Sequence, residues 1–126
     1  MKMKGLLIAM ALLLGTFAMQ AQADEWKEMD EYHSVMSATF HPAEEGDLKP
    51  VMTRAGELAQ KAQAWKKSTA PAKFDTPEIK KSLTLLTKES KALGKMVKKG
   101  KSEEEVKKAI FALHDRFHEI MELCHH

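Results

Sequence analysis

The chain has 126 residues, with 20 lysines and arginines against 18 aspartates and glutamates, and one cysteine. This length suits one domain with a modest core, and a single cysteine excludes an intramolecular disulfide. Acidic and basic residues are interleaved as on solvated helix faces, so the charge pattern does not indicate nucleic acid as a partner.

The N-terminus predicts export. Met-Lys-Met-Lys is followed by an apolar run over residues 6–19 and by Ala21-Gln22-Ala23. This order is typical of a signal peptide spanning residues 1–23, and the apolar run is shorter than the roughly 20 residues of a membrane helix. We therefore expect a periplasmic protein whose mature domain is 24–126, with no membrane span; a retained N-terminal anchor is the alternative.

The first helix is predicted from Asp24 to His41. Its larger side chains recur at steps of three and four, which places them on one stripe facing a core. Pro42 and Gly46 are predicted to end the helix. The stripe consists of Trp26, Met29, His33, Met36 and Phe40.

A second helix is predicted to begin at Asp47, an N-cap residue, with Pro50 in its first turn. Its apolar face continues to Trp65. The segment 67–77 contains two prolines and small polar residues, so it is predicted to be the longest connection.

Two further helices complete the predicted domain. Thr76 and Pro77 form an N-cap followed by a proline in the first helical position, and Gly100 provides the stop. Ser102 and Glu105 form a capping box for a last helix that runs to the C-terminus. We therefore predict an all-α, antiparallel up-down-up-down four-helix bundle in which the first and last helices are neighbours.

Histidines are confined to the first and last predicted helices. His114 and His118, four residues apart, share a helix face and could bind one metal ion. His33 lies on the apolar stripe, where an imidazole needs a partner: a metal, a polar side chain or water. Met36 beside it is either a ligand or core filling. The six histidines are His33, His41, His114, His118, His125 and His126.

The C-terminal Cys124-His125-His126 has two interpretations. It could bind a soft metal, or it could be a disordered end whose thiol pairs with a second copy to form a dimer. No paired carboxylates and no activated serine are evident, so we do not expect an enzyme.

Over nearly its whole length, the mature sequence resembles the cytochrome b562 family and, more distantly, the cytochrome c′ bundles. The resemblance is carried by Ala23-Asp24, Met29, Ala62-Gln63-Ala64, Thr76-Pro77-Glu78-Ile79-Lys80 and Phe117-His118. It implies non-covalent haem b with Met29 and His118 as axial ligands, and an electron carrier that serves a periplasmic redox partner.

The sequence also departs from the family pattern. It has no Cys-x-x-Cys-His for covalent haem attachment. His114 and Glu122 stand where the family usually has arginines, four residues before and after the histidine ligand.

A register argument gives the alternative to haem. If Met29 and His118 lie at one height on antiparallel helices, His33 meets His114 about 6 Å away along the axis. Histidines with a methionine suit copper, zinc or nickel without haem. Three hypotheses remain: a cytochrome, a bundle with incidental histidines that acts as an interaction module, and a periplasmic metal-binding or buffering protein with a metal-handling partner. The metal ligands would be His33, His114 and His118, with Met36 or Cys124.

Overall fold

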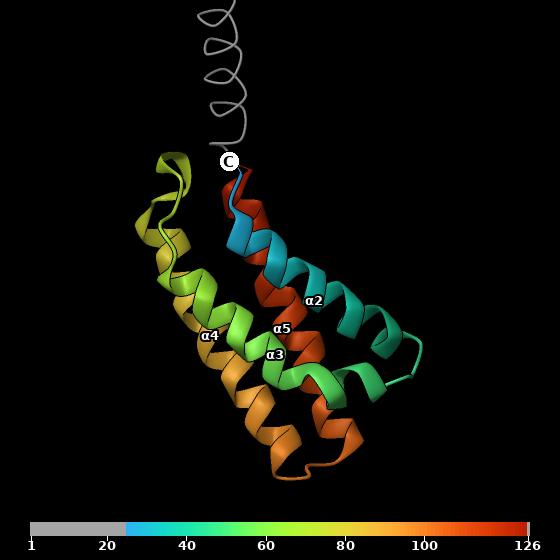
Figure 1. Cartoon of the computed structure of the whole chain (residues 1–126). Coiled ribbons are helices and arrows are strands. Elements are labelled where there is room, and N and C mark those ends of the chain that lie inside the picture. The colour runs from blue at the N-terminus through green and yellow to red at the C-terminus, as the bar shows by residue number, and fades with distance from the viewer. Residues whose placement is uncertain (1–24, 126) are drawn as a thin grey trace, which may run out of the picture.

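Four long helices and one 3-10 turn form a helical bundle in the computed structural model, which describes residues 25–125 (Figure 1). The described part contains no strand, and none of its helices is long and apolar enough to cross a membrane. The predicted signal peptide, 1–23, and His126 lie outside it. The elements are α2 (Lys27–Glu44), α3 (Lys49–Lys67), η1 (Ala72–Phe74), α4 (Pro77–Lys98) and α5 (Glu103–Cys124).

Local capping explains where α4 and α5 begin. The hydroxyl of Thr76 accepts a hydrogen bond from the backbone N–H of Ile79 at 3.2 Å. The hydroxyl of Ser102 accepts one from the N–H of Glu105, also at 3.2 Å. Each bond satisfies a donor that the first turn of a helix leaves free. The N-caps predicted at Thr76 and Ser102 are therefore confirmed. The one predicted at Asp47 was wrong, because α3 has Leu48 at that position.

The end of α2 differs from the prediction, because the helix continues through Pro42 to Glu44. The proline stands in the last turn, where it disturbs little of the helix. Its carbonyl accepts hydrogen bonds from the N–H groups of Glu45 and Asp47, which close the turn. The chain reverses at Gly46, whose φ of 92° favours glycine.

The buried face of α2 is rotated relative to the predicted stripe. Met36 is buried as expected, but His33 is exposed, so its placement on the core stripe was wrong. Tyr32 takes the inward position instead, with none of its surface exposed. Burying a phenol removes more apolar area from water than burying an imidazole and needs only one hydrogen-bond partner. Tyr32 finds that partner in the Ser90 hydroxyl, at 2.9 Å.

An aromatic cluster fills the bundle beside this face. Fully buried Trp65 lies 5.7 Å from Trp26, 5.5 Å from Tyr32 and 6.1 Å from Phe117, measured between ring centroids. Phe74 of η1 stacks on Trp26 at 6.1 Å. The long α3–α4 connection therefore contributes to the core, through a residue that its polar composition did not indicate.

Tyr32 should make the fold sensitive to alkali. Burial, and to a lesser extent the charge of Glu89, raises the pKa of this phenol, although the Ser90 hydrogen bond opposes the shift. The unfolded chain releases the phenolic proton above about pH 10, whereas the folded chain retains it. The stabilisation is complete below pH 10 and falls by up to about 1.4 kcal/mol per pH unit above it. Urea unfolding between pH 9 and 11 should show this loss in the native protein and a smaller one in Tyr32→Phe; equal slopes would contradict the assignment.

One pair of neighbouring helices packs loosely. The pairs α2–α3, α3–α4 and α4–α5 pack extensively, whereas α2 and α5 share far fewer contacts. The described histidines all lie on or next to these two loosely packed helices, at positions 33, 41, 114, 118 and 125.

Candidate functional site

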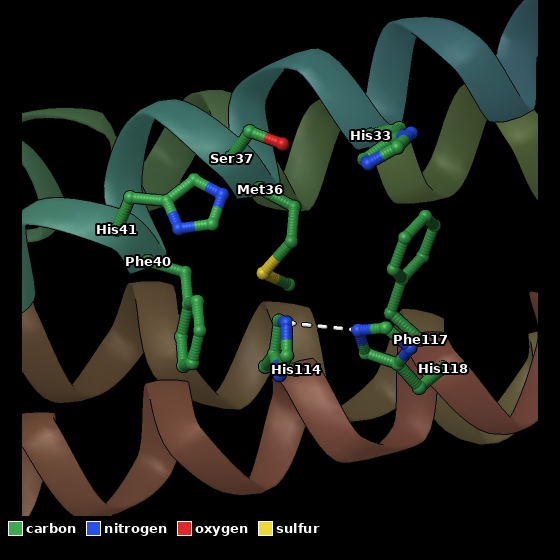
Figure 2. A pocket seen from close by; sticks show the side chains of 8 residues that line it. All are labelled: His33, Met36, Ser37, Phe40, His41, His114, Phe117 and His118. Carbon is green, nitrogen blue, oxygen red and sulfur yellow. Dashed lines mark hydrogen bonds between the residues drawn. The ribbon is translucent and has the colours of Figure 1, made fainter. Parts of the chain in front are cut away.

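A pocket of about 230 Å³ opens between α2 and α5. We call it the α2–α5 pocket. Its lining combines aromatic and apolar side chains with four imidazoles, which Figure 2 shows. Its lining residues are His33, Met36, Ser37, Phe40 and His41 from α2, and His114, Phe117 and His118 from α5.

His114 and His118 form the best-defined polar pair in this pocket. Their Nε2 atoms are 3.1 Å apart, so one ring donates its N–H to the other. Two nitrogens bound to one tetrahedral ion at 2.0–2.1 Å would be separated by about 3.3 Å. The pair therefore already has nearly the spacing of two ligands of a single metal ion. An ion placed there would replace the shared proton, and the donor ring would then carry its proton on Nδ1.

Phe40 holds one of these imidazoles in place. Its ring stacks on His114 with 3.6 Å between centroids and 3° between planes. Burial lowers the pKa of His114, and His118 and His41 lower it further, whereas Asp115 and Glu44 raise it. This shift favours the neutral imidazole, which is the form that binds metal.

Across the pocket, α2 presents a thioether and two more imidazoles. Met36 is 1% exposed, and its sulfur reaches into the pocket toward His114 (Figure 2). His33 and His41 lie at opposite ends of the pocket, as expected for residues about 12 Å apart along a helix. The ring of His33 packs against Phe117 at 5.0 Å.

This packing differs from the register that the sequence suggested. His33 was expected opposite His114, but it contacts Phe117, and Phe40 covers His114. The two helices are thus shifted by roughly one turn relative to that expectation. Periodicity defines the face of each helix, but it leaves the sliding of one helix along another undetermined.

The predicted haem ligands are not brought to one cavity. His118 lines the α2–α5 pocket, whereas Met29 packs half-buried against the core and is not among the lining residues. Tyr32, Trp65 and Phe117 fill the neighbouring interior, and the pocket is smaller than the roughly 300–1,000 Å³ typical of organic ligand sites. This arrangement does not fit a haem; axial ligation by Met29 and His118 stays a prediction.

Cys124 lies apart from the other candidate ligands. It lines a different pocket, with Lys73, Phe74, Leu123 and His125. Its thiol is half-buried, and burial raises its pKa. Because metals bind the thiolate, this cysteine is poorly suited to join the His114–His118 pair.

Sequence reasoning gave little weight to His41, which the structure adds to the pocket. Residues 33, 37 and 41 are spaced by four and therefore share one face of α2. That spacing could have indicated His41. Its Nδ1 lies 3.2 Å from the Glu44 carboxylate, so the ring is oriented by a neighbour on its own helix.

Within residues 25–125, no three histidine, cysteine, aspartate or glutamate side chains are close enough together to hold a metal ion as they stand. The histidine pair is thus a two-nitrogen anchor rather than a complete site. Comparisons with protein-family models, curated proteins and solved structures found no match to the chain.

Proposed function

We propose that this protein binds a single transition-metal ion in the α2–α5 pocket. The observation that carries the proposal is the 3.1 Å separation of the His114 and His118 Nε2 atoms beside the buried thioether of Met36. Two imidazoles on successive turns need only a small movement to chelate one ion. Because this pair is exposed to solvent, water or another side chain could complete the coordination of the ion.

Copper is the ion that this donor set favours. Imidazole suits copper, zinc and nickel, but thioether sulfur is a soft ligand that selects Cu(I). Every lining side chain is neutral when its histidines are unprotonated, which favours a monovalent ion over a divalent one, because less charge is left uncompensated. A copper-binding or copper-buffering role, with a metal-handling protein as partner, follows from these donors.

The cellular setting belongs to the same proposal. A leader over residues 1–23 would deliver the domain to the periplasm. An antiparallel up-down-up-down arrangement is supported by the short connections and by the contacts of Tyr32 with Phe117 and of Phe40 with Phe111. This arrangement makes α2 and α5 neighbours, which the pocket requires.

Metal titration tests the proposal directly. The mature protein should bind one equivalent of Cu(I) under anaerobic, reducing conditions, more tightly than Zn(II) or Ni(II). Free copper at one hundred times Kd should stabilise the fold by about 2.7 kcal/mol, which raises Tm by about 10 °C. Competition with a chromophoric Cu(I) chelator and thermal unfolding supply the two measurements.

Haemin is the informative comparison ligand. A sharp Soret band with split visible bands on reduction, lost in Met29→Ala and His118→Ala, would favour the cytochrome over the metal protein. An unchanged Tm with every metal ion would overturn the proposed function, since a ligand that binds only the native state must stabilise it.

A further inference from the structure

His41 lines the α2–α5 pocket near the end of α2, and its ring is bonded to Glu44 on the same helix. His41 Nδ1 and Glu44 Oε1 are 3.2 Å apart, three residues apart on one helix. The two side chains are 67% and 49% exposed, so both are accessible from solvent. Figure 2 shows the His41 imidazole beside Met36, facing the pocket rather than turned away from it.

This hydrogen bond selects one tautomer of the imidazole. A carboxylate only accepts hydrogen bonds, so Nδ1 must carry the proton that it donates to Glu44. In the neutral ring, Nε2 then has a free lone pair. Histidines that bind metals almost always donate their second nitrogen to a carboxylate, carbonyl or water in this way, which orients the ring and increases its basicity.

The neighbouring aromatic ring brings His41 close to the anchor. Phe40 stacks on His114 at 3.6 Å, and the same ring lies 5.9 Å from His41. His41 and His114 therefore both adjoin the Phe40 ring, and both line the same cavity.

His33, the other pocket histidine of α2, has no carboxylate that orients its ring. Its ring packs against Phe117, and within residues 25–125 it has no hydrogen bond to a carboxylate. It also lies at the opposite end of the pocket from His41, whose ring is bonded to the Glu44 carboxylate.

We propose that His41 is the third imidazole ligand of the ion anchored by His114 and His118, and that Glu44 is the positioning residue that holds its Nε2 ready. This inference rests on the proposed function, because it needs an ion in the pocket. It assigns the ligand role on α2 to His41 in place of His33. Glu44 also compensates part of the charge of the ion.

Single substitutions separate these roles. His41→Ala and Glu44→Ala should each weaken Cu(I) binding at pH 7.5, the latter by about 10-fold or more. Glu44→Gln keeps an oxygen acceptor and should recover part of the loss. Glu45→Ala is the matched control, because Glu45 is exposed and adjacent but is not bonded to His41. His33→Ala should weaken Cu(I) binding less than His41→Ala does.

A second measurement tests whether Glu44 acts by orienting the His41 imidazole. Nitrogen-15 NMR of the metal-free protein should show His41 protonated on Nδ1, and Glu44→Ala should shift it toward the Nε2-protonated form. If copper binds normally and His33→Ala loses affinity while His41→Ala does not, the inference is overturned and the proposed function stands. If the native protein binds no metal, both fall.

Discussion

Without the imidazole of His118, the protein should keep its fold and lose its response to copper. His118 is exposed, so truncating it removes little buried surface. It supplies one of the two nitrogens, 3.1 Å apart, that we propose as the anchor of the ion. Losing a direct ligand should cost more affinity than the roughly 10–100-fold attributed to outer partners. His118→Ala should therefore show no copper-dependent rise in Tm at concentrations that stabilise the native protein by about 2.7 kcal/mol.

His125 offers a control close to this position. It is also an exposed histidine, directly after α5, but it borders the pocket of Cys124 rather than the α2–α5 pocket. His125→Ala should bind copper as the native protein does. Full stabilisation of His118→Ala by copper, or its loss in His125→Ala, would refute the assignment of the anchor.

Trp65→Ala should be the most damaging single change to the fold. Trp65 is fully buried and touches Trp26, Tyr32 and Phe117, so it joins α3 to both helices of the pocket. Truncating a buried tryptophan costs about 3–5 kcal/mol through lost transfer energy and the cavity that remains. Domains of this size are stable by only about 5–15 kcal/mol in total. Urea unfolding, followed by circular dichroism, measures the loss.

Two further variants test whether the loss of stability comes from the Trp65 side chain itself. Lys66→Ala changes the adjacent, exposed position and should stay within about 0.5 kcal/mol of the native protein. Trp65→Phe should cost less than Trp65→Ala, because it keeps an aromatic ring and removes an indole N–H that has no hydrogen-bond partner among the described residues. A loss below about 1 kcal/mol in Trp65→Ala would contradict the central place of this side chain.

Local signals in the sequence predicted much of the fold. Thr76 and Ser102 mark helix starts through bonds to the third residue after them, so the sequence contains the whole interaction. Pro42 was misread because its missing N–H removes one backbone hydrogen bond from α2 without ending the helix. The choice of Tyr32 over His33 for the core depended on Ser90, a partner on another helix.

The candidate site was predicted less completely, for a related reason. The four-residue spacing of His114 and His118 is local, and it correctly indicated that they share a helix face. The relation of Met29 to His118 depends on how far α2 slides along α5, which no local pattern specifies. The structure brings His33 to Phe117 instead, and it adds His41, whose partner Glu44 was visible in the sequence.

The aromatic cluster has a spectroscopic consequence. The chain contains two tryptophans, and both belong to this cluster. Trp65 adjoins Phe117, whose ring lies 6.3 Å from that of His118. The tryptophan fluorescence of the protein thus originates next to the pocket. Cu(II), a paramagnetic quencher, would lower its intensity on binding there. If copper binds as proposed, tryptophan fluorescence would report the valence and the occupancy of the ion without an added label.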